Sequence, residues 1–211
     1  MTGLRERKKQ RTRRALVNAA LRSFKEKGYE ETTIAEIAAE ADVSARTFFS
    51  YFASKEDVIF HDGPERMRRA RELVAGRRPG EPVADLLLRV TRASLEAAAG
   101  PEEFDLEEAT ARLELMLTVP ALQARGLHLL FEQQLQLAEA LERAYPGELD
   151  TVEAAAVVGS LIGAIKLAAM VSLTRGDPRE RMREAVRTAA EIALHGLPAR
   201  FTGADRAPAE P

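Results

Sequence analysis

The chain has 211 residues, 45% hydrophobic and 30% charged, which is the balance of a globular protein with one large or two small domains. It contains no Cys, and its three His residues (His61, His128 and His195) are far apart, so disulfides and a Cys nucleophile are excluded and we expect no metal site. The net charge of −2 is unevenly spread: residues 1–60 carry 12 Lys and Arg against 9 Asp and Glu, whereas residues 61–211 carry 19 against 24.

The N-terminal segment is strongly basic, with eight Lys and Arg and a single acidic residue, Glu6, in residues 1–22. Such an arm on a neutral-to-acidic body suggests an end that faces a polyanion, although a solvated terminus is the alternative. Its apolar stretch ends at Arg22, so no secretory signal is predicted and we expect a soluble, cytoplasmic protein.

The first 60 residues predict four helices. The first runs from about Arg5 to Lys27 and stops at Gly28, and the second begins at a capping box, Thr33–Glu36. After a tight connection, Ser44 caps a short third helix over 45–51, and Ser54 caps the fourth.

The rest of the chain also predicts helices. Gly63-Pro64 interrupts the fourth helix, which continues over 66–74 as a second segment, and a Gly- and Pro-rich linker follows at 76–82. Further helices are expected at roughly 83–99, 103–118, 121–145, 151–174 and 178–196. The segment 198–211 is expected to be disordered. The prediction is an all-α protein of about nine helices without a sheet.

Two short helices joined by about three residues are typical of a helix-turn-helix, whose second helix enters the DNA major groove. Aromatic residues are concentrated here, and Phe48 and Phe52 are spaced to pack the third helix onto the first two. The run TTIAEIAAEADVSARTFFSYFASKE, from Thr32 to Glu56, together with residues 7–60 around it, resembles the N-terminal domain of the TetR family of transcriptional regulators.

The resemblance implies a DNA-binding role for particular residues. Thr33 would meet a phosphate at the start of the second helix, and Ser44 would cap the recognition helix. Arg46 would pair with guanine, with Ala45 and Thr47 also at base edges and Ser50 behind them. Tyr51 and Lys55 would bind phosphates. Two positions depart from the common family pattern: Arg46 replaces a frequent Gly, and Phe49 replaces a frequent Tyr.

The C-terminal helices carry two further expectations. The segment 154–174 has one charge, Lys166, and small residues that favour a close helix–helix interface over a membrane span. We expect this helix and the last one to form a homodimer bundle, as is typical of the family, with a core helix in a monomer as the alternative. The interface residues predicted are Gly159, Gly163, Val186 and Ala189.

In the family a small-molecule pocket lies between the preceding helices, for which the candidates are Met116, His128, Phe131 and Gln134.

These observations predict a helix-turn-helix DNA-binding domain at 1–54, a connecting helix and linker at 55–80, and an effector-binding and dimerisation domain at 81–197. The function predicted is that of a homodimeric, ligand-responsive transcriptional repressor, which binds double-stranded DNA at a palindromic operator. An architectural DNA-binding protein without an effector is the alternative. No nucleophile–base pair, metal cluster or phosphate-binding glycine loop is present in the sequence, so we expect neither an enzyme nor a cofactor. The effector and the operator sequence are not predicted.

Overall fold

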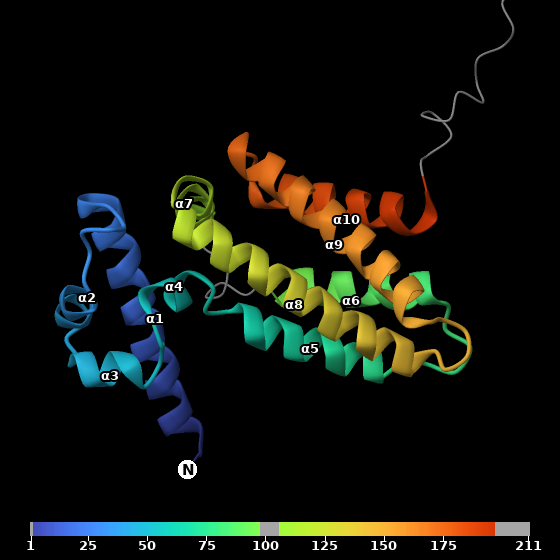
Figure 1. The fold of residues 1–211 in the computed structure, drawn as a ribbon, viewed down its shortest axis with the longest axis horizontal. Helices are drawn as coiled ribbons and strands as arrows, with labels where there is room; N and C mark the ends of the chain where they lie inside the picture. The colour runs from blue at the N-terminus through green and yellow to red at the C-terminus, as the bar shows by residue number, and fades with distance from the viewer. Residues whose placement is uncertain (1, 98–105, 197–211) are drawn as a thin grey trace, which may run out of the picture. The chain divides into compact units, whose positions relative to one another are not determined.

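The computed structural model describes residues 2–97 and 106–196, and within them the chain forms ten α-helices and no strand. The all-α prediction is therefore confirmed. The count exceeds nine because the predicted interruption of the fourth helix divides it in two. The helices are α1 Thr2–Lys27, α2 Ile34–Glu40, α3 Ala45–Phe49, α4 Lys55–Ile59, α5 Gly63–Ala75, α6 Val83–Ala97, α7 Leu106–Thr118, α8 Pro120–Ala144, α9 Thr151–Thr174 and α10 Arg179–His195 (Figure 1).

The helices form two compact units. The first unit comprises Met1–Pro64 and Asp105–Leu129, and the second comprises Glu65–Phe104 and Leu130–Pro211. The first thus holds α1 to α4, α7 and the beginning of α8, and the second holds the remaining helices. The functional boundaries expected at residues 54 and 80 stay predictions, and the expected disorder of 198–211 lies outside the described residues.

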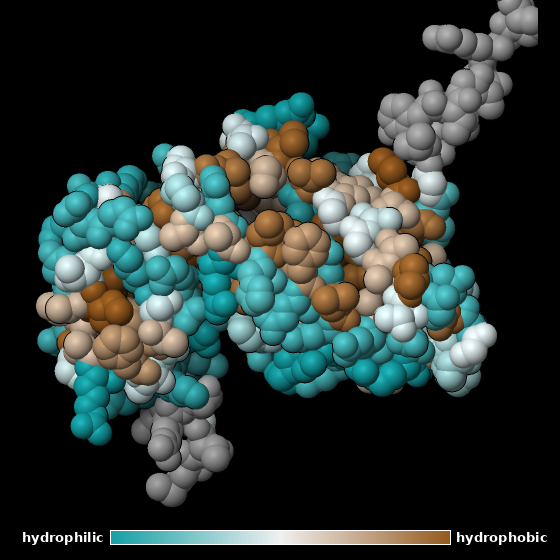
Figure 2. Space-filling model, in the orientation of Figure 1, coloured by the Kyte–Doolittle hydropathy of each residue, from teal (hydrophilic) through white to brown (hydrophobic). Residues whose placement is uncertain are grey.

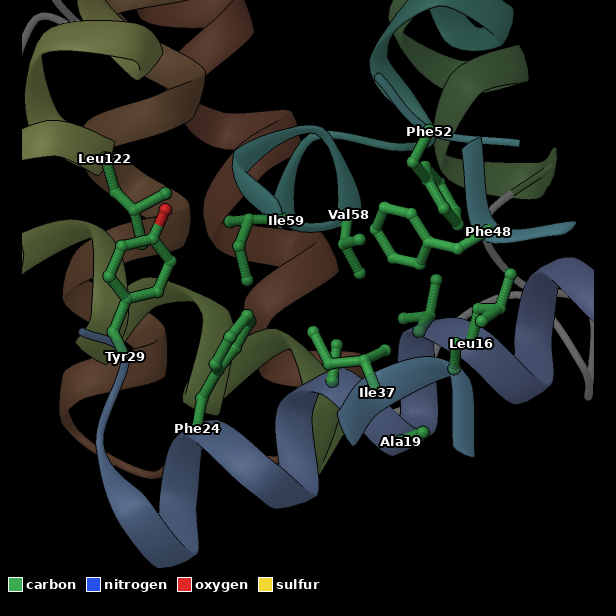
Figure 3. Close-up of a cluster of buried hydrophobic side chains, with 13 residues drawn as sticks. Leu16, Ala19, Phe24, Tyr29, Ile37, Phe48, Phe52, Val58, Ile59 and Leu122 are labelled. Atoms are coloured by element: carbon green, nitrogen blue, oxygen red, sulfur yellow. The ribbon is translucent and has the colours of Figure 1, made fainter. Parts of the chain in front are cut away.

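The first unit has its own hydrophobic core, built mainly from α1, α2, α3 and α4 (Figure 3). Leu16 of α1, Ile37 of α2 and Phe48 of α3 are all fully buried in it. Leu122 of α8 is also fully buried in the same cluster. Helices of five to seven residues are not stable alone, so this shared core is what holds α2, α3 and α4 in place.

The second unit is built around a separate core to which α5, α6, α8, α9 and α10 all contribute. Tyr145, just after α8, is fully buried there, and its hydroxyl donates to the carbonyl of Glu81 at 2.8 Å. The guanidinium of Arg77 lies 3.8 Å from the centre of the Tyr145 ring. These contacts fasten the segment between α5 and α6 to the end of α8. The most extensive helix pair of this unit is α9 with α10.

Candidate nucleic-acid interface

Helices α2 and α3 form the predicted helix-turn-helix, joined by the turn Ala41–Ser44. The turn reverses the chain through Asp42, whose φ of 55° lies in the left-handed region that Asp tolerates better than most residues. The next amide, of Val43, donates to the carbonyl of Ala38 at 2.9 Å. The motif is therefore rigid, and the face of α3 opposite the fully buried Phe48 is left open to solvent.

The start of α2 is closed by the predicted capping box. The backbone N–H and the hydroxyl of Thr33 both donate to the Glu36 carboxylate, each at 2.9 Å, and the Thr33 hydroxyl accepts from the Glu36 amide. The Lys27 ammonium lies 2.7 Å from the same carboxylate, and together these donors lower the pKa of Glu36 to about 2. Thr33 would therefore have to exchange a Glu36 bond for any phosphate contact, and that contact stays a prediction.

The side chains of α3 fall into two groups. The hydroxyls of Ser44 and Thr47 lie 2.9 Å apart, and Ser44 also accepts from the Thr47 amide, so both are used in the helix cap. Ala45, Arg46 and Ser50 are exposed. The Ser50 hydroxyl donates to the Thr47 carbonyl at 2.6 Å, which leaves its oxygen free to accept only. Arg46 is thus the exposed charged group of this helix, and Tyr51 beyond it is half-buried.

Lys55 at the start of α4 has a position that the sequence did not reveal. Its ammonium donates to the carbonyls of Tyr29, Glu30 and Thr32, at 2.8, 3.3 and 3.4 Å. It also lies 4.3 Å from the centre of the Tyr29 ring, while the Tyr29 hydroxyl donates to Glu56 at 2.7 Å. Lys55 therefore ties the loop before α2 to α4. Lys55 and Glu56 both contact Tyr29, but the sequence indicates this arrangement only once the two segments are known to be neighbours.

Further contacts within the first unit hold the end of α4 in place. Arg13 of α1 donates to the carbonyl of His61, and its guanidinium lies 5.5 Å from the centre of the Phe52 ring. Arg112 of α7 donates to the carbonyl of Ile59 and to the carboxylate of Asp62. The helix-turn-helix is thereby supported by α1 and by α7.

The basic N-terminal segment lies on α1, and its described side chains include a run of exposed cations. These are Arg7, Lys8, Lys9, Arg11 and Arg14. An exposed helix segment of about two turns with this charge is the kind of surface that contacts phosphates without reading sequence. Together with exposed Arg46, the first unit carries both elements of a DNA-binding surface, a cationic helix and a short helix with an open face.

Comparison with known proteins agrees with this geometry. Residues 16–61 match the family model for bacterial regulatory proteins of the tetR family. The chain is also similar to the HTH-type transcriptional regulator TcmR of Streptomyces glaucescens, with 54% identity over 56 residues. A second relative is the HTH-type transcriptional regulator HbdR of Aromatoleum sp. strain CIB, with 44% identity over 48 residues. Residues 16–61 therefore form a DNA-binding domain of the TetR family.

These sequence matches cover 26% and 23% of the chain, and 25% and 21% of the two relatives' own lengths. Both relatives are named as transcriptional regulators, not as enzymes.

The TetR fold extends over nearly the whole chain. A regulator from Syntrophomonas wolfei superposes with a TM-score of 0.59 at 20% identity, covering 90% of this chain and 98% of that one. The TetR-family repressor FadR of Thermus thermophilus, in complex with lauroyl-CoA, superposes with a TM-score of 0.52 at 24% identity, covering 94% and 99%. At these identities the likeness concerns the fold alone.

The four predicted pocket residues do not line one surface hollow in the part of the chain that the structure describes. Met116 is half-buried and His128 exposed in the first unit, whereas Phe131, 57% exposed, and half-buried Gln134 belong to the second. Two surface hollows of the second unit, of about 290 and 530 Å³, are lined by other residues. Both hollows are open and have Arg and Glu in their walls, so the pocket residues stay predictions.

The four predicted dimer residues differ in exposure. A Cβ atom built on Gly159 or Gly163 of α9 would meet no neighbouring atom within 4 Å, so packing within the chain leaves room for at least a methyl group at both positions. Ala189 of α10 is half-buried, whereas Val186 is only 7% exposed and offers little surface to a partner.

Two features of the described residues concern other classes of function. Helix α9 is long and apolar enough to cross a membrane by length and composition, with a mean hydropathy of 2.0 in its most apolar window, and only 17% of that window is buried. No group of three or more His, Asp or Glu side chains capable of holding a metal ion is present in the part of the chain that the structure describes.

Proposed function

We propose that this chain is a homodimeric transcriptional repressor of the cytoplasm, which binds a palindromic operator through α3 and is released by a small hydrophobic effector. The observation that carries the proposal is the position of Arg46. It is exposed on a short helix whose opposite face is fixed by fully buried Phe48. A guanidinium held in this way can donate two hydrogen bonds to guanine in the major groove.

The dimer is supported by the exposed face of α9. One face of this helix carries residues three or four apart that are exposed, except for half-buried Gly163. They are Val152, Ala156, Ser160, Gly163, Leu167 and Val171. Val152, Leu167 and Val171 are 76%, 63% and 46% exposed. Figure 2 shows apolar residues on the visible face of the second unit, over α8 and α9. A large apolar stripe with small residues in its middle suits a second copy of the same helix.

Two observations support a small hydrophobic effector: exposed apolar residues on α8 and the ligand of a protein with the same fold. Phe131, one of the predicted pocket residues, and Leu135 lie one turn apart on α8 and are each 57% exposed, which provides apolar surface for a ligand. The repressor FadR of Thermus thermophilus binds lauroyl-CoA on the same fold. Apolar walls with a few polar groups accept ligands of this chemistry.

DNA binding is tested by selecting an operator from a random pool and measuring fluorescence anisotropy for wild type, Arg46→Ala and Arg175→Ala. Arg175 is a matched exposed arginine at the end of α9. We expect a palindromic consensus, a loss of about 1–3 kcal/mol for Arg46→Ala with relaxed preference at one position per half-site, and wild-type behaviour for Arg175→Ala. Binding that follows only salt concentration, with no consensus, would contradict the proposal and favour the architectural alternative.

Ligand response is tested separately, by thermal unfolding and operator release with lauroyl-CoA, laurate and coenzyme A as probes. A ligand that binds only the folded state raises the unfolding midpoint. We expect the acyl-bearing probes to raise the midpoint and to weaken operator binding. Operator binding unchanged by every apolar probe in a broader set would instead indicate a regulator without an effector.

A further inference from the structure

Phe49 is an exposed aromatic residue on the helix proposed to enter the major groove. It is 57% exposed, although it directly follows fully buried Phe48. It is four residues after Ala45 and three after Arg46, both of which are exposed. Since residues four apart share a helix face, α3 presents an apolar flank of Ala45 and Phe49 beside a polar centre of Arg46 and Ser50.

The Phe49 ring packs against the protein on one side. It meets the Phe48 ring edge-to-face, with centroids 5.7 Å apart and planes at 86°. Phe48 is itself packed on Phe52, at 5.6 Å, inside the core of the first unit (Figure 3). The rest of the Phe49 ring is exposed, and an aromatic side chain supplies a large apolar contact area with only two rotatable bonds, so Phe49 is suited to recognition.

We infer that Phe49 reads the 5-methyl group of a thymine in each half-site, next to the guanine bonded by Arg46. The phenyl ring carries no donor for a phosphate oxygen or a base edge. In the major groove the thymine methyl is the apolar group that a base edge presents, and Phe is among the side chains that contact it. Phe49 would then determine sequence preference. The inference rests on the proposed DNA-binding function.

The test compares operator duplexes in which each thymine is replaced, one position per half-site at a time, by deoxyuridine. This removes the methyl group and leaves base pairing intact. Affinity is measured for wild type, Phe49→Ala and Phe49→Leu, with Leu117→Ala as control. Leu117 is a comparably exposed apolar residue, at 49%, on α7 of the same unit. Circular dichroism and the unfolding midpoint confirm that each variant is folded.

We expect wild type to lose about fourfold in affinity per methyl removed at one thymine position. A buried methyl-sized group contributes about 0.8 kcal/mol, and 1.36 kcal/mol corresponds to tenfold. Phe49→Ala should bind the normal operator more weakly and lose this sensitivity, Phe49→Leu should keep part of it, and Leu117→Ala should behave as wild type.

Two results would overturn the inference, and they are distinguishable. If wild type binds its operator specifically but tolerates deoxyuridine everywhere, Phe49 does not read a methyl group while the proposed function stands. If wild type selects no sequence at all, the proposed function fails and this inference fails with it.

Discussion

At the residue scale, the candidate interface depends on side chains that are already engaged within the protein. Thr33, Ser44 and Thr47 have polar groups that suit DNA contact, yet each is bonded in a helix cap. Arg46 and Phe49 differ because their exposed groups point away from the core. The capping residues therefore position the motif, even where they could also contact a phosphate. Arg46 and Phe49, by contrast, are available to contact a base edge.

Lys55 allows this distinction to be measured. Lys55→Met keeps the apolar stem but removes three hydrogen bonds to carbonyls and the contact with the Tyr29 ring. We expect the free energy of unfolding in urea to fall by about 1–3 kcal/mol, because charged hydrogen bonds in a half-buried site are lost. Lys25→Met, at an exposed lysine with a 3.6 Å ion pair to Glu107, should change it by less than about 0.5 kcal/mol.

The opposite pattern would contradict this structural role. If Lys55→Met unfolds like wild type but binds operator more weakly and with a reduced salt dependence, then Lys55 acts as a phosphate contact.

At the element scale, much of the fold follows from short signals in the sequence. Gly28 predicts the end of α1, the capping box at Thr33 predicts the start of α2, and the Gly63-Pro64 dipeptide predicts the break between α4 and α5. The role of Lys55 could not be predicted, because it depends on where the loop before α2 lies relative to α4, which no local pattern encodes. For the same reason the pocket residues could not be assigned from helical spacing alone.

The capping box at α2 gives a pH prediction. Lys27 and the donors of Thr33 lower the pKa of Glu36 to about 2, whereas the unfolded chain has the ordinary value near 4.5. A lowered folded-state pKa contributes stability that is fully present above the unfolded pKa and lost as the pH falls toward the folded one. The stabilising charge is therefore complete above about pH 4.5 and disappears toward pH 2.

The variant Glu36→Gln retains the size of the side chain without its charge. We expect its unfolding midpoint to lie below that of wild type at pH 7, and the difference between the two proteins to shrink steadily below pH 4.5. Comparing the two proteins at each pH cancels the other carboxylates, such as Glu65 and Glu81, whose pKa values are also lowered to about 2. A difference that stays constant from pH 7 to pH 3 would show that the charge of Glu36 has no part in the cap.

At the scale of the whole molecule, the unusual feature is an apolar helix that its own chain leaves largely uncovered. One face of α9 contributes Ala154, Val158 and Leu161 to the core of the second unit. The other face exposes Leu167 and Val171. A soluble protein rarely exposes an apolar stripe of this length without a partner, and Lys166 would be costly in a bilayer. A second copy also provides the two recognition helices that a palindromic operator requires.

Gly163 offers a direct test of this assembly. A Cβ atom at this position would meet no neighbouring atom within 4 Å, so a larger side chain can begin there without a clash. Gly163→Leu should therefore separate two α9 helices that approach closely, while circular dichroism and the unfolding midpoint check that the variant is folded. In sedimentation experiments we expect wild type at twice the 23.2 kDa chain mass and Gly163→Leu shifted toward a single chain. Ala75→Leu, at an exposed alanine of α5, should remain dimeric. The same Gly163 variant should lose affinity for the full palindrome while binding an isolated half-site as wild type does, because only the linkage between half-sites is removed. A Gly163→Leu protein that remains a dimer would place the interface elsewhere on the chain.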